Sequence, residues 1–282
     1  MGGRAKKDGR GEGAEAASAF YVYCVGAREE VAPLVAEAPG AIEEGAGVEA
    51  VGGGRFAAVV SAVPAADYGE ESFESRLMTD AEWTAARALR HERVVEHFAA
   101  RATVVPLRFG TIYLRRERVE QMLAEKAAEL EAVLARLRGR EEWGVNLYCD
   151  RAKLREVIAS VSPRLRELGE QASQASPGQA YLMRKKIEAL RDDETRAEIK
   201  RAAAEIENAL ASAAEGSARL RVLKSEAGEH GETAAKLAFL VARERFADFR
   251  ATAERLADAH LARGFRLELT GPWPAYNFAS ES

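Results

Sequence analysis

The order of strand-like runs and helical stretches constrains this 282-residue chain more than any other feature. In the first half, four runs have strand length and are rich in β-branched and aromatic residues: 20–25, 48–51, 55–63 and 103–109. Helical spacing lies between the first and second runs, at 31–37, and between the third and fourth, at 83–100. The predicted order is therefore βαββαβ, which is the order of a ferredoxin-like domain.

The second half repeats this order. Its strand-like runs are residues 142–149, 220–224, 234–241 and 265–269. Its last helix is predicted at 243–263 and ends at Gly264, a residue suited to a left-handed C-cap. Its first crossover is longer, because residues 150–214 hold two helical segments around a break at 173–178. We predict an α+β fold of two ferredoxin-like domains with added long amphipathic, coiled-coil-like helices.

Two local signals place a helix start and a turn. Thr79 and Glu82 have the S/T-x-x-E spacing of a capping box, which predicts that the long helix of the first half begins there. The three glycines at 52–54 separate two strand-like runs, and their backbone accepts positive φ. We therefore expect a hairpin turn at this position.

The composition changes along the chain predict its division. Residues 1–18 are rich in glycine and in charges of both signs, and they have no apolar period, so we predict a disordered tail. Residues 19–113 form the predicted first domain and residues 141–282 the second, which carries the insertion at 150–214. Residues 114–140 form a predicted linking helix.

The linking helix carries an apolar stripe at alternating steps of four and three, with one polar position. Its members are Val119, Leu123, Lys126, Leu130, Val133 and Leu137. The insertion has similar faces at Met183, Ile187 and Leu190 and at Ala203, Ile206 and Leu210. Two interpretations are open: each stripe packs on its own domain, or the helices form an exposed arm that binds a partner.

The composition excludes several classes of function. The formal net charge is −4, so the chain lacks the excess of positive charge that nucleic acids and anionic membranes attract. No apolar stretch approaches the ~18 residues needed to span a bilayer. Two cysteines provide neither a disulfide framework nor a zinc cage, and the N-terminus lacks the apolar segment of a secretory signal. We expect a cytoplasmic protein without nucleic-acid or membrane partners.

A search for catalytic constellations finds none. The four histidines, His91, His97, His230 and His260, are too scattered to predict a metal site. There is no G-x-S-x-G elbow, no P-loop and no H-E-x-x-H motif. We therefore predict no catalytic residue, no metal, no cofactor and no small-molecule substrate, and we interpret His91 as a histidine at the edge of the core.

Two segments are unusually apolar for solvated loops. In residues 104–113, a lone Arg108 interrupts an apolar run beside Phe109. In residues 269–278, two prolines follow the last strand-like run, and the aromatic residues there are Trp273, Tyr276 and Phe278. Each segment either closes a core, with Arg108 paired to a buried carboxylate, or forms an aromatic docking patch for a partner. Both interpretations are open at this point.

Several short motifs together resemble the gas vesicle GvpL/GvpF family. They are a Y-x-Y strand at Tyr21 and Tyr23, a helix histidine at His91, P-L-R-F-G-T at 106–111, E-W at Glu142 and Trp143, Y-L-x-x-K-K at 181–186, and L-T-G-P-W-P-x-Y-x-F at 269–278. The last of these and the R-F-G-T run are the most specific in combination. The resemblance covers about residues 20–279.

The resemblance implies a non-enzymatic minor component or assembly factor of gas vesicles, located at the vesicle and in the cytoplasm before assembly. It implies two ferredoxin-like domains, in agreement with the order of elements above. It also implies contact with the very hydrophobic major shell protein GvpA and with other accessory Gvp proteins. On that basis the candidate binding residues are Arg108, Phe109, Trp273, Tyr276, Phe278, Tyr181 and Lys185.

Tandem ferredoxin-like domains have other uses, so two alternatives stay open. An ACT-like regulatory protein would bind a small ligand between its domains. An RRM-type protein would stack RNA bases on exposed aromatics such as Tyr21, Tyr23 and Phe56, although the net charge disfavours this.

Overall fold

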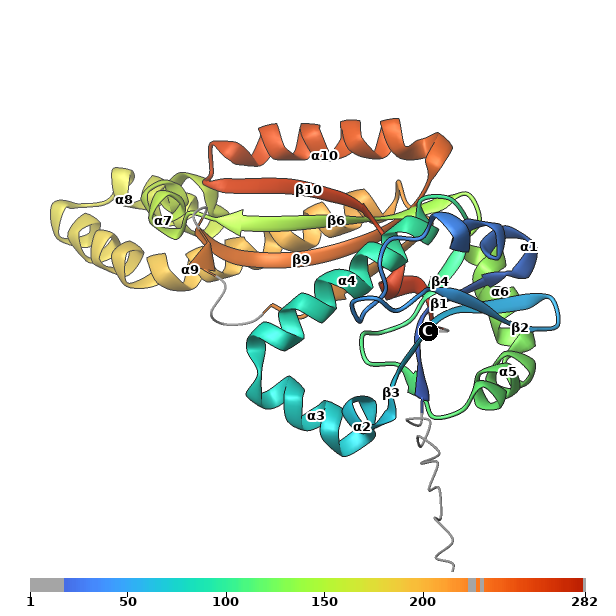
Figure 1. The fold of residues 1–282 in the computed structure, drawn as a ribbon. Coiled ribbons are helices and arrows are strands. Elements are labelled where there is room, and N and C mark those ends of the chain that lie inside the picture. The colour runs from blue at the N-terminus through green and yellow to red at the C-terminus, as the bar shows by residue number, and fades with distance from the viewer. Residues whose placement is uncertain (1–17, 223–226, 229–230, 281–282) are drawn as a thin grey trace, which may run out of the picture. The chain divides into compact units, whose positions relative to one another are not determined.

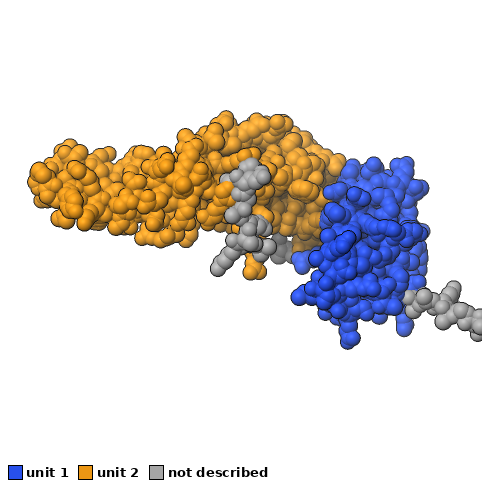
Figure 2. All heavy atoms as spheres, turned by 60° about the vertical axis from the view of Figure 1, so that its left-hand side comes forward, with its two compact units in different colours: residues 1–130 blue, residues 131–282 orange. Residues whose placement is uncertain are grey.

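A computed structural model describes residues 18–222, 227–228 and 231–280. The chain has a mixed α+β fold and divides into two compact units, residues 1–130 and 131–282, which are coloured separately in Figure 2. Each unit has its own antiparallel sheet. The predicted disordered tail lies outside the described residues, except for Ser18, which begins the first strand.

Unit 1 contains one antiparallel sheet of five strands. They are β1 (Ser18–Ala27), β2 (Glu49–Gly53), β3 (Phe56–Pro64), β4 (Val104–Pro106) and β5 (Ile112–Tyr113). The strand order is β2-β3-β1-β4, and β5 also pairs with β1. The turn between β2 and β3 contains Gly54 with φ +68°, in agreement with the predicted glycine hairpin. The central β1 is buried over most of its length.

The helices of unit 1 differ from the predictions at their ends. They are α1 (Arg28–Val31), a 3-10 helix (Pro33–Glu37), α2 (Ala65–Tyr68), α3 (Glu70–Thr79), α4 (Ala81–Ala99) and α5 (Arg116–Glu125). The predicted capping box is wrong: Asp80 caps α4 by accepting a hydrogen bond from the Trp83 N–H (2.9 Å). Thr79 instead ends α3 and donates to the Ser75 carbonyl. The carboxylate of Asp80 therefore outcompetes the hydroxyl one residue earlier.

Two helices occupy the segment that was predicted as one linking helix. After α5, Lys126 leaves helical geometry, and α6 (Ala127–Leu137) follows it. The apolar members of the stripe are buried, whereas Lys126 is exposed. The single polar position of the stripe therefore coincides with the break between the helices.

Unit 2 also contains one antiparallel sheet of five strands. They are β6 (Arg140–Cys149), β7 (Gly216–Leu220), β8 (Ala227–Gly228), β9 (Gly231–Ala242) and β10 (Phe265–Trp273). The order is β10-β6-β9-β7, with β8 paired to β9 (Figure 1). The predicted strand at 220–224 lies four residues earlier, and residues 223–226 are outside the described part. The two sheets therefore have corresponding orders. The first strand β1 lies between β3 and β4, and its counterpart β6 lies between β9 and β10.

Three helices form the crossover between β6 and β7 where two were predicted. They are α7 (Arg151–Val161), α8 (Pro163–Gln174) and the 35-residue α9 (Pro177–Ala211). Pro163 begins α8 because proline fits the first turn of a helix but not its interior, and Ser162 caps it. A 3-10 turn (Arg243–Arg245) and α10 (Phe246–Leu261) precede β10, and Gly264 has φ +90° as the predicted C-cap requires.

The helices of unit 2 cover one face of its sheet. Odd-numbered residues of β6, β9 and β10 form a core with α7, α9 and α10; examples are Leu147, Phe239 and Phe265. Alternation along a strand turns even-numbered residues to the other face. Cys24 in unit 1 and Cys149 in this core are both free and buried. Burial raises the pKa of both thiols.

Candidate functional site

The closing segment, residues 270–278, forms the end of β10 and the 3-10 turn after it (Tyr276–Phe278). Trp273 is 49% exposed, whereas Tyr276 and Phe278 are half-buried. Gly271 has φ +120°, and a Cβ there would lie 3.1 Å from the Glu142 carbonyl oxygen. The backbone therefore turns sharply at Gly271, a position where a larger residue would be strained. The Trp273 indole, two residues later, lies at the surface.

Two polar side chains hold the closing segment in place. The buried carboxylate of Glu142 accepts hydrogen bonds from the Asn277 N–H (3.0 Å) and from Asn277 Nδ2 (2.6 Å). Burial raises the pKa of Glu142, and the two hydrogen bonds partly oppose that shift. Arg136 donates to the carbonyl oxygens of Phe278 (2.5 Å) and Ser280 (2.8 Å). The segment is thus fixed on both sides of Phe278.

Two glycines let aromatic side chains approach the sheet closely. A Cβ at Gly144 would lie 2.6 Å from Thr270 Oγ1 and 3.5 Å from Trp273 Nε1, and Trp273 Nε1 donates to Thr270 Oγ1 (3.1 Å). A Cβ at Gly216 would lie 3.2 Å from the ring of Phe278. Both predicted interpretations therefore apply to this segment: Phe278 packs on the sheet, and Trp273 remains accessible.

An apolar groove of about 400 Å³ lies beside the closing segment, between α10 and the β6–β10 edge of the sheet. Its floor includes Leu267 and Leu269. Its end is formed by Trp143 and Phe246, whose rings stack with centroids 4.0 Å apart. The Trp143 indole N–H is buried without a hydrogen-bond partner among the described residues. The groove lies on the helix-covered face of the sheet, whereas the Trp273 indole lies over Gly144 on the other face.

Tyr181 and Lys185 lie near the start of α9. Tyr181 is 55% exposed and its neighbour Leu182 is 66% exposed. Lys185 Nζ lies 5.3 Å from the centre of the Tyr181 ring, in a cation–π contact. In Figure 1 the start of α9 and the end of β10 lie at opposite ends of unit 2. The structure therefore does not bring these two residues together with Trp273.

Arg108 and Phe109 lie in the loop between β4 and β5 and point in different directions. Arg108 is exposed, so the interpretation that it pairs with a buried carboxylate is wrong. The Phe109 ring lies 5.7 Å from Phe73 and 5.8 Å from His91. Gly110 has φ +88°, and a Cβ there would lie 2.8 Å from the Phe73 ring. This motif therefore packs inward through Phe109 and leaves only Arg108 available to a partner.

The Y-x-Y strand and the helix histidine form the centre of unit 1. Tyr21 and Tyr23 are fully buried, and the Tyr21 hydroxyl lies 2.9 Å from His91 Nδ1. The same hydroxyl accepts a hydrogen bond from the Gly110 N–H (3.0 Å). Phe56 is also buried. The RNA-stacking interpretation of these three aromatics is therefore wrong, because they lie inside the unit.

His91 is fully enclosed by this aromatic cluster. Burial lowers its pKa to about 4, although a hydrogen bond with the Leu107 backbone acts in the opposite direction. The imidazole is therefore neutral at pH 7. Its ring lies among Tyr21, Tyr23 and Phe109, so His91 lies inside the core, whereas the sequence predicts a position at the core's edge.

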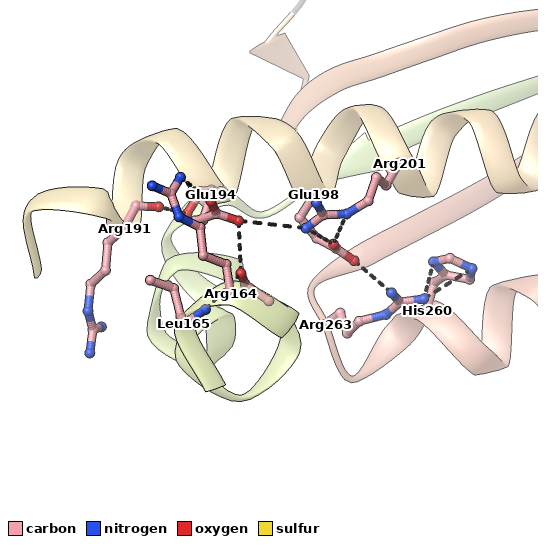
Figure 3. A network of polar contacts seen from close by, with 10 residues as sticks. Arg164, Leu165, Arg191, Glu194, Glu198, Arg201, His260 and Arg263 are labelled. Atoms are coloured by element: carbon pink, nitrogen blue, oxygen red, sulfur yellow. Dashed lines mark hydrogen bonds and ion pairs between the residues drawn. The ribbon is translucent and has the colours of Figure 1, made fainter. Parts of the chain in front are cut away.

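A polar network in the helical crossover escaped the sequence analysis (Figure 3). The buried Glu194 carboxylate accepts a hydrogen bond from Ser162 Oγ (2.8 Å). The buried Glu198 carboxylate pairs with Arg263 Nη1 (2.7 Å), whose guanidinium also contacts His260. Burial, and then the Arg263 charge, lower the pKa of His260. Both carboxylates lie on the face of α9 that continues to the apolar residues Ala202, Ile206 and Leu210. Charged residues at these apolar positions are the sequence signal from which the network could have been predicted.

The described part of the chain contains no group of three or more His, Cys, Asp or Glu side chains arranged to hold a metal ion. Among the helices of that part, none is both long enough and apolar enough to cross a membrane. Among the candidate residues, Trp273, Tyr181 and Arg108 have side chains exposed to solvent.

Comparison with known proteins gives one family. The family model described as gas vesicle synthesis protein GvpL/GvpF matches residues 19–280. Gas vesicle protein L of a Streptomyces species is 31% identical over 230 residues, which are 80% of each chain. Gas vesicle protein L1 of Halobacterium salinarum is 27% identical over 200 residues, covering 68% of this chain and 69% of the relative.

Two solved structures have a similar fold. The crystal structure of gas vesicle protein GvpF from Anabaena superposes with a TM-score of 0.66 at 18% identity, covering 94% of this chain and 97% of that one. GvpF from Microcystis aeruginosa superposes with a TM-score of 0.58, also at 18% identity, covering 93% and 99%. The mixed α+β architecture is thus shared over nearly the whole length of the described residues.

Proposed function

This chain belongs to the gas vesicle synthesis protein GvpL/GvpF family, and from that premise we propose that it serves gas vesicle formation by binding vesicle proteins. Its principal partner in this proposal is the major shell protein GvpA, and other accessory Gvp proteins are further partners. It acts at the growing vesicle and in the cytoplasm before assembly. It performs no bond chemistry, and it needs no cofactor.

The observation that carries this proposal is the exposed Trp273 on a segment fixed by Glu142 and Arg136. A large aromatic side chain provides much apolar contact area, and such residues dominate the binding energy of interfaces. Because the segment is already ordered, little conformational entropy is lost when a partner binds. Phe278 packs on Gly216 and contributes by holding the segment in position.

The chemistry of the partner fits this surface. A shell protein with a gas-facing apolar surface must be shielded from aggregation before it enters the wall. Trp273 is a large apolar side chain at the surface of the closing segment, and its indole lies over Gly144 on the sheet face away from the helices. An apolar segment of GvpA would be shielded from water where it contacts this side chain.

We assign the other candidate residues to accessory Gvp proteins. Tyr181 and Lys185 form a compact aromatic and cationic surface at the start of α9, apart from the closing segment. In unit 1, the exposed Arg108 is the only member of its motif that we include. Separate surfaces would allow the protein to hold GvpA and a second protein at the same time.

We also infer that both units are modified ferredoxin-like domains, within 19–113 and 141–282, joined through residues 114–140. What supports this is the identical strand order of the two sheets, in which all neighbours are antiparallel. A ferredoxin-like βαββαβ domain has its first strand between its fourth and third strands. The helices α7 to α9 are then an enlarged first crossover.

The experiment is a pull-down of GvpA with the tagged full-length chain, both expressed together. We expect the Trp273→Ala variant to bind GvpA at least about tenfold more weakly, because truncation of a hot-spot aromatic residue costs about 2 kcal/mol or more and about 1.4 kcal/mol corresponds to tenfold. The Asn277→Ala variant keeps Trp273 but loosens its anchor, and we expect an intermediate loss. Undiminished GvpA with a natively folded Trp273→Ala variant would contradict the proposal.

The matched control is Leu89→Ala, which truncates a 61% exposed apolar side chain in unit 1. We expect it to retain GvpA at the unaltered level. A double Tyr181→Ala and Lys185→Ala variant should keep GvpA and lose accessory Gvp proteins, which mass spectrometry of the same eluates measures. Loss of GvpA in this variant would move the shell-protein surface to α9.

A further inference from the structure

Strand β10 lies at one end of the unit 2 sheet and leaves an edge open. Among the described residues it has a strand neighbour only on the β6 side (Figure 1). Open edges pair readily with other strands, and proteins usually protect them with proline, lysine or a bulge. Here the residues from Phe265 to Thr270 pair with β6 in unbroken register, and the shift comes only between Thr270 and Trp273.

The hydrogen-bond pattern shows which backbone groups reach this edge. In antiparallel pairs, alternate residues turn their N–H and C=O groups to opposite sides of the strand. The Asp150 N–H donates to the Gly264 carbonyl oxygen (2.8 Å), so the even-numbered residues of β10 face β6. Phe265, Leu267 and Leu269 therefore direct their N–H and C=O groups to the open edge.

We propose that this edge binds the same edge of a second copy of the chain, antiparallel, about a two-fold axis at Leu267. In this register Leu267 faces Leu267 of the second copy, and Phe265 faces its Leu269. The backbone N–H and C=O groups of Phe265, Leu267 and Leu269 all point to the open edge. Each of the three residue pairs therefore exchanges two hydrogen bonds, which gives six between the two strands. The pairing joins the two unit 2 sheets into one continuous sheet.

The charges of β10 select this register. With the axis at Leu267, Arg266 lies opposite Glu268 of the second copy, and Glu268 lies opposite its Arg266. Both side chains are on the face away from the helices, where Tyr148 already donates to Glu268 Oε2 (3.0 Å). Directly opposed opposite charges stabilise strand pairs, and like charges destabilise them. The run R-L-E is therefore complementary to itself.

Neighbouring registers lack this complementarity. An axis at Arg266 sets arginine opposite arginine, and an axis at Glu268 sets glutamate opposite glutamate. An axis at Leu269 places Pro272 opposite Arg266, where the ring prevents a regular ladder. Only the Leu267 axis combines opposed charges with a full set of backbone hydrogen bonds.

The helix-covered face of the same edge is apolar. The groove beside α10 has Leu267 and Leu269 on its floor, and Ala257 on its α10 wall. In the proposed pair, the same residues of the second copy point to this face and cover the open side of the groove. The small side chain of Ala257 leaves space for the helix of the second copy to approach. Pairing therefore removes apolar surface from water on this face.

The test measures the mass of the full-length chain by sedimentation velocity between about 1 and 100 µM, a range in which a weak dimer forms by mass action. We expect a reversible monomer–dimer equilibrium. In the Arg266→Glu variant, residue 266 of each copy faces Glu268 of the other, so two pairs of like charges replace two pairs of opposite charges. We expect the dissociation constant of the dimer to rise by about tenfold. The double variant Arg266→Glu with Glu268→Arg restores opposite charges and should restore the dimer. Arg255→Glu, an equal charge change on the outer surface of α10, is the control and should leave the dimer unchanged.

A second variant separates the edge from the fold. Leu267→Pro removes an N–H group that β6 does not use, so the monomer should keep its circular dichroism spectrum but lose the dimer. In hydrogen exchange, the amides of Phe265, Leu267 and Leu269 should gain protection with concentration. A monomer at every concentration, or a dimer that tolerates both Leu267→Pro and Arg266→Glu, would overturn the proposal. So would protection of these amides by a different protein alone.

Discussion

The two units share a strand order, but different kinds of side chain pack around their first strands, β1 and β6. In unit 1, β1 contributes Tyr21 and Tyr23, whose hydroxyls contact His91 and Ser61 in a buried aromatic cluster. In unit 2, the equivalent face of β6 contributes Val145 and Leu147 to an apolar core. The polar groups of unit 2 lie instead in the helical crossover, around Glu194 and Glu198. The same strand order is thus compatible with two distinct cores.

This difference explains what the family motifs contribute. The Y-x-Y strand, the helix histidine and Phe109 of the R-F-G-T run meet inside unit 1, where they specify packing. The closing motif of unit 2 is divided: Phe278 packs on Gly216, and Trp273 remains exposed. A shared motif therefore indicates a contact surface only where part of it stays at the surface.

The largest expected effect tests the two first strands directly. Tyr21→Ala should lower the free energy of unfolding by about 5 kcal/mol, because it leaves a cavity and removes the partner of His91 and of the Gly110 N–H. Leu147→Ala in β6 should cost about 3 kcal/mol, since only apolar contacts are lost. Urea denaturation measures both values. Equal losses would show that the polar contacts of the aromatic cluster contribute nothing.

The next effect concerns pH. The pKa of His91 is about 4 in the folded chain and ~6.5 in the unfolded chain, so the unfolded state takes up the proton first as the pH falls. Stability from this group is complete above about pH 6.5 and declines by up to about 3 kcal/mol towards pH 4. Urea denaturation of the unaltered chain and of His91→Gln at pH 7 and at pH 4.5 measures this contribution. We expect the urea midpoint of the unaltered chain to fall more between the two pH values than that of the variant.

His260, a buried histidine of unit 2, provides the comparison for that measurement. The pKa of His260 is also lowered, by burial and then by Arg263, while Glu205 acts in the opposite direction. Its contribution to stability therefore has the same sign. We expect His260→Gln to remove a separate part of the loss at low pH. A His91→Gln variant with the full acid sensitivity of the unaltered chain would contradict the buried, neutral state of His91.

The smallest expected effect compares two glycines of unit 1. Gly110→Ala should cost about 2 kcal/mol, because φ is +88° and the new Cβ would lie 2.8 Å from the Phe73 ring. Gly54 has φ +68°, but nothing lies within 4 Å of a Cβ at this position. We therefore expect Gly54→Ala to lower the free energy of unfolding by about 1 kcal/mol, from backbone strain alone. Thermal unfolding measures the difference. If Gly54→Ala costs as much, the loop after β4 does not depend on the aromatic cluster.

Local patterns were enough to predict most strands. Runs rich in β-branched and aromatic residues identified β1, β3, β6 and β10, although β1 and β3 are buried over most of their length. The helix starts were less certain, since Thr79 and Asp80 are both good caps and the choice depends on backbone geometry. The break at Pro163 was missed because the periodicity continues across it.

The candidate site was only partly predictable. The aromatic residues of the closing segment stood out by composition, but their division into half-buried Phe278 and exposed Trp273 depends on Gly144 and Gly216, far away in the sequence. The anchor between Glu142 and Asn277 joins residues 135 positions apart. No local pattern contains such a pair, because it arises only when β10 docks beside β6.

That anchor also has a consequence for the timing of biosynthesis. Glu142 leaves the ribosome long before Asn277, so its carboxylate stays without this amide partner through the synthesis of α7 to α10. The closing segment can take its final position only after residue 277 has emerged. A nascent or prematurely terminated chain therefore cannot display Trp273 in its anchored form, and the surface proposed for GvpA is withheld from chains whose unit 2 is still incomplete.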